Sequence, residues 1–227
     1  MKQLFFFIAL ICCHHTKAQG EAELLKLVKA KLDKVKDYQA KGKMIIDVSF
    51  IKAPPSGVAV YFKQPDKFKV IKEGGISLLP KGGVNINISS LLSNNQYTAV
   101  GAGTAMVSGI STRVIKLLPL DEISDVVITT LYIDVKNALV RKTSVTTKES
   151  GSYEIELGYS KYTDWGLPDK TVFVFNTKDY KLPKGITFEY DKGDNRKKEV
   201  PKNKKGRIEI RYSNYIINKG VSDTIFK

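Results

Sequence analysis

Few residues in this sequence have the type and spacing that covalent catalysis requires. Ser49-Phe-Ile-Lys52 matches the S-x-x-K pattern of Ser-Lys enzymes, in which the pattern opens a helix. Here it follows alternating hydrophobic residues that predict a strand, and side chains three apart on a strand point to opposite faces. The serine and the lysine would therefore not meet, and the match indicates no nucleophile.

Two further patterns suggest cofactors but lack the necessary surroundings. Val100-Gly-Ala-Gly-Thr-Ala-Met106 approaches the dinucleotide fingerprint, but its last residue replaces the third glycine and no strand–helix–strand unit surrounds it. The acidic residues at 121–125 and at 191–194 lack the ligand spacing of a calcium-binding EF-hand loop. We expect surface acids there, and neither a cofactor nor a metal.

The first residues have the features of a cleavable signal peptide. Lys2 is followed by ten apolar residues, Leu4–Cys13, and Thr16-Lys-Ala18 offers an approximate cleavage site. The apolar run would rise only about 15 Å as a helix, which is too short to cross a bilayer core of about 30 Å. We therefore expect a signal peptide at 1–19, cleaved near Ala18 or Gln19, and one exported domain at 20–227.

Cleavage would remove every cysteine and histidine of the chain, namely Cys12, Cys13, His14 and His15. The mature protein would then lack a disulfide, a thiolate nucleophile, an imidazole base and a Cys/His zinc site. We therefore expect a protein that is not an enzyme, with a carboxylate-based hydrolase as a remote alternative. A lipid-anchored form, acylated at Cys12 or Cys13, is a second alternative, although Ile11 is not the small residue that such signals need.

The charge of the chain is strongly basic. Without Lys2 and Lys17, the remaining 35 basic residues exceed the 23 acidic residues by 12. An exported protein rarely meets nucleic acid, so we expect an anionic membrane surface, an anionic lipid headgroup or an acidic protein as partner instead, or a charge that serves solubility alone. The run 192–207 predicts a basic hairpin tip that is either a docking site or a solvated loop that discourages edge pairing. The candidate docking residues are Lys197, Lys198, Lys204 and Lys205.

Hydrophobic periodicity predicts the elements that hold these residues. Apolar residues at spacings of three and four predict an amphipathic helix over Glu21–Asp37, and about ten segments alternate with period two. They predict a mainly β fold with one curved antiparallel sheet, an unclosed barrel, covered by the helix and by lid segments. An immunoglobulin-like sandwich is the alternative. Residues 73–110, rich in Gly, Ser and Asn, predict a long loop that is either a lid or a poorly ordered insertion.

Four segments resemble the bacterial outer-membrane lipoprotein carrier family, LolA, within the superfamily that includes LolB and LppX. They are the helix-to-strand stretch at 25–40, Tyr61-Phe-Lys-Gln-Pro-Asp-Lys-Phe68, the strand–turn segment Leu131–Leu139, and the end of the chain from Ile210 to Phe226. The resemblance implies an unclosed barrel with an apolar cavity under its helices. It also implies a non-enzymatic carrier that moves acyl chains of lipoproteins or lipids across the periplasm to the outer membrane.

The implied partners are these acyl chains and membrane-bound donor or acceptor proteins, with the carrier itself a monomer. Gln64 replaces the arginine that precedes the turn proline in the carriers, so lipid binding is implied while lipoprotein hand-off stays open. A periplasmic interaction or sensor module of the same superfamily, binding a protein partner, is the alternative function. The candidate cavity-lining residues, which alternatively pack a tight core against the helix, are Met44, Ile46, Val48, Phe50, Val60, Phe62, Phe68 and Val70.

Overall fold

The computed structural model describes residues 16–48, 54–73, 92, 96–121, 123–149, 151–176 and 205–226. Within these residues, helix α1 (Thr16–Leu32) is followed by strands and two short 3-10 turns, η1 (Thr163–Trp165) and η2 (Asp223–Phe226). The strands are β1 (Asp37–Asp47), β2 (Ser56–Lys63), β3 (Lys67–Lys72), β4 (Tyr97–Val107), β5 (Ile110–Pro119), β6 (Val126–Asp134), β7 (Leu139–Thr147), β8 (Ser152–Gly158), β9 (Lys170–Asn176) and β10 (Lys205–Ile217).

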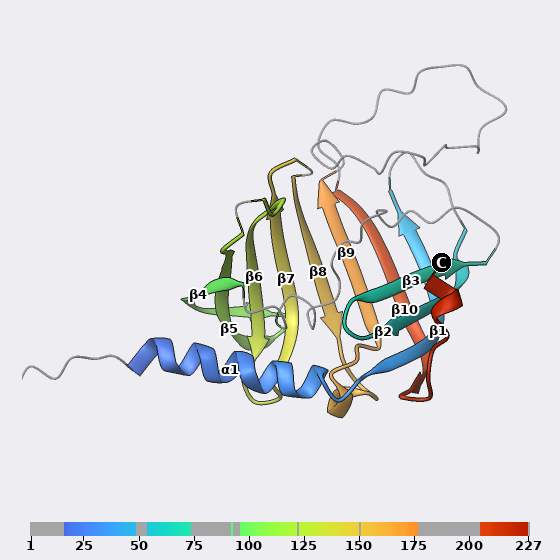
Figure 1. The fold of residues 1–227 in the computed structure, drawn as a ribbon. Coiled ribbons are helices and arrows are strands. Elements are labelled where there is room, and N and C mark those ends of the chain that lie inside the picture. Colours follow the sequence, from blue (N-terminus) through green and yellow to red (C-terminus); the bar gives the residue numbers. More distant parts are fainter. Residues whose placement is uncertain are drawn as a thin grey trace, which may run out of the picture.

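These strands form one antiparallel sheet in the order β3-β2-β1-β10-β9-β8-β7-β6-β5-β4. The last strand, β10, lies between β1 and β9 and thereby joins the two ends of the chain, whereas the other neighbours follow one another in sequence. The sheet curves and leaves β3 and β4 as separate edges, and α1 crosses it (Figure 1). The predicted single curved sheet with an N-terminal helix is confirmed, and the two-sheet sandwich is not found.

One face of the sheet is apolar because its strands alternate. Along β1 the buried side chains include Ala40, Met44 and Ile46, while Lys41 and Lys43 are exposed. The same face of β10 contributes Ile208 and Ile210 to this core. Three residues of α1 complete it: Leu24, Leu25 and Val28. The burial of each such side chain contributes about 1.5–3 kcal/mol of free energy, and this contribution holds the helix on the sheet.

The prediction of the helix end was wrong. We expected the helix to continue to Asp37, but α1 ends at Leu32 and β1 begins at Asp37. The amide of Val35 donates to the carbonyl of Leu32, which tightens the turn. Val35 then packs with Phe62 and Leu167 in a second, smaller cluster instead of continuing the stripe of α1.

The prediction of one long loop at 73–110 was also wrong, because β4 lies within it. Most side chains of β4 are exposed, so the alternation that reveals a strand is absent there. The strand contains a bulge between Gly101 and Thr104, and Gly103 adopts a φ of +82°, which favours glycine. The glycine-rich segment that approached a dinucleotide fingerprint is thus an antiparallel edge strand. Of the expected lid, residues 74–91 and 93–95 lie outside the described residues.

Candidate functional site

The predicted cavity-lining residues converge on the face that α1 covers. Met44, Ile46, Val48 and Val60 are buried in the core that also contains Leu24, Leu25 and Val28 of α1. Phe62 lies in the second cluster, and Phe68 and Val70 are partly buried against these clusters. Phe50 lies outside the described residues. The lining of a ligand cavity by these residues stays a prediction.

The predicted docking lysines fall mostly outside the described part of the chain. Lys197, Lys198 and Lys204 are outside it, and Lys205 is the exposed first residue of β10, opposite Asn176 of β9. Their role in docking also stays a prediction.

Tyrosine and phenylalanine rings close one end of the apolar face. Tyr38 stacks near Phe62 and Tyr215, with ring centroids 5.4 and 5.2 Å apart, and Tyr162 approaches Tyr215 at 4.8 Å. The hydroxyl of Tyr215 donates to the carbonyl of Pro168 over 2.7 Å. Burial raises the pKa of Tyr215 above its ordinary value, so this phenol stays neutral. This end of the face therefore contains neutral aromatic groups.

Helix α1 is attached to the sheet by two polar contacts that are ten residues apart, which is about 15 Å along its axis. A carboxylate oxygen of Glu21 lies 3.1 Å from the guanidinium of Arg113 on β5. At the other end, the ammonium of Lys31 donates to the carbonyl of Asn137 over 2.5 Å. Between the described residues of α1 and the sheet, no backbone-to-backbone hydrogen bond is found. Within the described part of the chain, the helix is therefore held on the sheet by side chains.

The contact at Glu21 is tightly confined. The side chain of Glu21 is only 7% exposed, and its second carboxylate oxygen has no partner among the described residues. A Cβ atom added to Gly101 of β4 would lie 2.5 Å from the paired oxygen. A glycine at this position thus lets the edge strand approach the helix.

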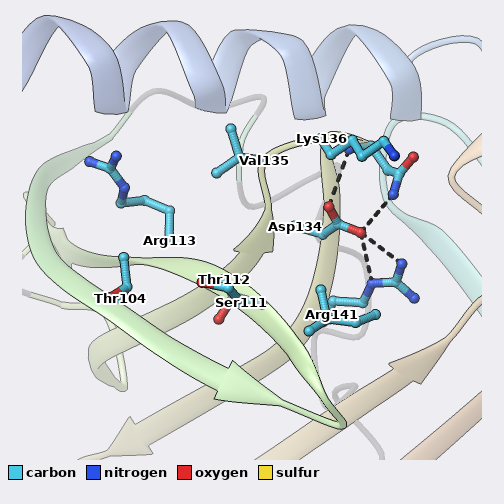
Figure 2. Close-up of a pocket in the computed structure, with 10 residues that line it drawn as sticks. Thr104, Ser111, Thr112, Arg113, Asp134, Val135, Lys136 and Arg141 are labelled. Carbon is cyan, nitrogen blue, oxygen red and sulfur yellow. Dashed lines mark hydrogen bonds and ion pairs between the residues drawn. The ribbon is translucent and has the colours of Figure 1, made fainter.

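A pocket of about 460 Å³ lies under α1, between the β4–β5 pair and the β6–β7 turn (Figure 2). Its lining residues come from two strand pairs that are separate in the sequence, so no local motif predicted it. The one signal was the segment Leu131–Leu139, which resembled a strand–turn of the carriers. The lining residues are Thr104, Ile110, Ser111, Thr112, Arg113, Asp134, Val135, Lys136, Asn137 and Arg141.

Asp134 organises one wall of this pocket (Figure 2). It is 4% exposed and accepts hydrogen bonds from the amide and side chain of Asn137, at 3.3 and 2.8 Å, and from Arg141, at 2.7 and 3.3 Å. Burial alone would raise the pKa of this carboxyl, but the hydrogen bonds from Asn137 and Arg141 outweigh it and hold the pKa below its ordinary value. Arg141 also lies over the ring of Tyr159, 5.3 Å from its centroid. The wall is therefore charged and rigid.

The other charged residues of the pocket are cations. Arg113 is 43% exposed and pairs with Glu21. Lys136 is exposed and has no ion-pair partner in the described part of the chain. In that part, no group of three or more His, Cys, Asp or Glu residues could hold a metal ion, and α1 is neither long nor apolar enough to cross a membrane.

Comparison with known proteins gives matches only in structure. No protein-family model matches the chain, and no curated protein matches its sequence. A putative outer membrane lipoprotein-sorting protein domain from Vibrio parahaemolyticus is similar with a TM-score of 0.61 and 10% identity, covering 92% of this chain and 97% of that one. A DUF1329 family protein from Desulfovibrio piger follows with 0.57 and 12%, covering 91% and 97%.

A LolA superfamily protein from Nitrosomonas europaea is similar with a TM-score of 0.52 and 9% identity, covering 91% of this chain and 97% of that one. At such identities the likeness concerns the fold. It covers more than nine-tenths of this chain and of each similar chain. The chain therefore has the fold of LolA-superfamily proteins, as the resemblance in its sequence predicted.

Proposed function

We propose that this protein is a non-enzymatic carrier that binds acyl chains of lipoproteins or lipids between α1 and the apolar face of its sheet. In the periplasm it would deliver them to the outer membrane. One observation supports this most directly: the apolar face is covered by a helix whose attachments to the described strands are made by side chains. A cover of this kind can move aside without breaking the hydrogen bonds of the sheet.

The energies of such an exchange are close to balance. Leu24, Leu25 and Val28 bury their side chains against the sheet, which is worth about 5–9 kcal/mol for the three together. An acyl chain that buries about ten methylenes in their place gains about 8 kcal/mol. The ligand can therefore replace the helix contacts, and release needs only a modest shift in favour of the closed state.

The test uses a fluorescent fatty acyl probe and two leucines of α1. Leu25 is 5% exposed and faces the sheet, whereas Leu27 is 51% exposed. We expect the mature protein to take up the probe. Leu25→Glu should weaken uptake about tenfold or more, because it places a carboxylate on the apolar face, and Leu27→Glu should leave it unchanged.

Leu25→Ala serves as a milder variant, and circular dichroism shows whether each variant is folded. Native mass spectrometry of protein purified from the periplasm provides an independent measurement, since bound lipid or acylated peptide should add to its mass. Recovery without lipid, together with no uptake of the probe, would contradict the carrier function.

Export is part of the proposal. Cleavage near Ala18 or Gln19 predicts a periplasmic protein that starts at residue 19 or 20, and the intact mass of the secreted protein measures this directly. An intact mass that includes Cys12 or Cys13 with added acyl groups would indicate the lipid-anchored form instead.

The alternative is an interaction module that binds an acidic protein through the basic run at 192–207. Its test is charge reversal of all four docking lysines. Two results together would favour this module over the carrier. The wild-type protein would take up no acyl probe, and charge reversal would abolish the capture of a periplasmic protein.

A further inference from the structure

The pocket under α1 adjoins the apolar face. Arg113 and Ile115 are two residues apart on β5 and therefore share one face of the strand, and Ile115 is fully buried in the core. On the next strand, the fully buried Ile133 pairs directly with Arg113, and Asp134 follows it as the last residue of β6. The residues that anchor α1 meet the pocket as well, because their partners Arg113 and Asn137 line it. A chain bound under α1 would thus have one end at this pocket.

We propose that the pocket binds the phosphoryl headgroup of a lipid whose acyl chain lies under α1. This rests on the proposed carrier function and adds the chemical class of its cargo. The pocket of about 460 Å³ is large enough for a phosphate together with its glycerol.

The charged side chains that line the pocket offer free donors and few free acceptors, while the hydroxyls of Thr104 and Ser111 can act as either. Both oxygens of Asp134 already accept hydrogen bonds from Asn137 and Arg141. Arg113 uses Nη1 for Glu21, which leaves its Nε and Nη2 donors for a ligand. Arg141 uses Nε and Nη2 for Asp134 and retains Nη1. Donors without matching acceptors select an anion.

The placement of these donors favours a group with several oxygens. Arg113 lies on β5, whereas Lys136 and Arg141 belong to the β6–β7 turn and β7, so the cations flank the pocket from different strands (Figure 2). Asp134 balances Arg141 and Glu21 balances Arg113, which leaves Lys136 as the charge without an ion-pair partner among the described residues. A phosphoryl group presents three acceptor oxygens and can meet such donors together.

Two ligands with the same acyl chain test the headgroup directly. Lauroyl lysophosphatidic acid and monolaurin share a twelve-carbon chain and glycerol, and only the first carries a phosphate. Competition with a fluorescent acyl probe measures both, and we expect the phosphate ligand to bind about fivefold more tightly at low salt. This advantage should shrink as sodium chloride is added.

Lys136→Glu should remove this preference and leave monolaurin binding within twofold. Lys116→Glu is the matched control, because Lys116 is an exposed lysine of β5 that does not line the pocket. It should change neither ligand. Equal binding of the two ligands to the wild-type protein, or the same loss of preference in both variants, would overturn the headgroup site while the carrier function stands.

The remaining outcomes separate the two proposals. Failure of both ligands to bind would overturn the carrier function and the lipid headgroup together. The last measurement is the affinity for inorganic phosphate alone, determined by calorimetry without any lipid. If phosphate alone bound as tightly as lysophosphatidic acid and lost its affinity in Lys136→Glu, the pocket would be a free-anion site and the lipid assignment would be wrong.

Discussion

Replacing Asp134 with alanine removes the acceptor of four hydrogen bonds, two from Asn137 and two from Arg141. Arg141 would remain 15% exposed and without its carboxylate. Breaking a buried ion pair by removing one partner costs about 3–5 kcal/mol, because the other charge is left uncompensated. Since Arg141 keeps some solvent contact and the ring of Tyr159, we expect the lower end, about 3 kcal/mol.

The matched control is a second ion pair of the same part of the sheet. Lys142 and Glu154 lie 2.7 Å apart, like Arg141 and Asp134, but their side chains are 20% and 34% exposed. Glu154→Ala should therefore cost no more than about 1 kcal/mol. Urea denaturation gives the free energy of unfolding for each variant, and an unchanged m-value shows that the transition is comparable.

A double variant separates the lost hydrogen bonds from the stranded charge. Arg141→Met keeps the apolar stem of the side chain and removes its charge. Combined with Asp134→Ala, it should recover much of the lost stability, because no unpaired charge remains. The reasoning fails if Asp134→Ala costs as little as Glu154→Ala, or if the double variant is less stable than Asp134→Ala.

Three smaller predictions concern packing and pH. A Cβ atom on Gly206 would lie 2.4 Å from the ring of Phe175, which is 4% exposed. Gly206→Ala should therefore lower the free energy of unfolding by about 1–3 kcal/mol. Urea denaturation measures this, and an unchanged midpoint would refute the contact. The pKa values of Asp134 and Glu209 lie below their ordinary values because hydrogen bonds from arginines, and from Asn137 for Asp134, outweigh burial. These two carboxylates therefore stabilise the fold at pH values above their ordinary pKa of about 4. The stabilisation is lost as the pH falls through their lowered pKa values, so the Tm should drop on acidification. Burial raises the pKa of Tyr153 to about 12, and ultraviolet titration should show this phenol ionising well after an exposed tyrosine.

The strands were predictable wherever one face is buried and the other is charged. β7 lies in one of the alternating segments, and turn residues end the alternation on both sides of it. β1 and β2 followed from the same pattern, and helix α1 followed from its own stripe of apolar residues. In each case the local periodicity and the tertiary packing agree.

The elements that were mispredicted lack this agreement. β4 carries small exposed residues on both faces, so its pairing with β5, rather than its own sequence, defines it as a strand. The end of α1 depends on Val35, which joins Phe62 and Leu167 from distant parts of the chain. Arg113 and Asp134 line the pocket from adjacent strands, and their spacing along the sequence does not reveal this.

The proposed function places selectivity at the rim of the sheet. Each buried methylene contributes about the same free energy, so an apolar face distinguishes acyl chains mainly by length. Discrimination between cargoes then depends on polar groups that gain or lose hydrogen-bond or ion-pair partners. Leaving a buried polar group unpaired costs more free energy than losing the burial of one methylene. In the described residues these groups concentrate where α1 meets the β6–β7 turn, at Arg113, Lys136 and Arg141. Substitutions there should change which lipid is bound, whereas substitutions on the buried face of α1 should change whether any lipid is bound.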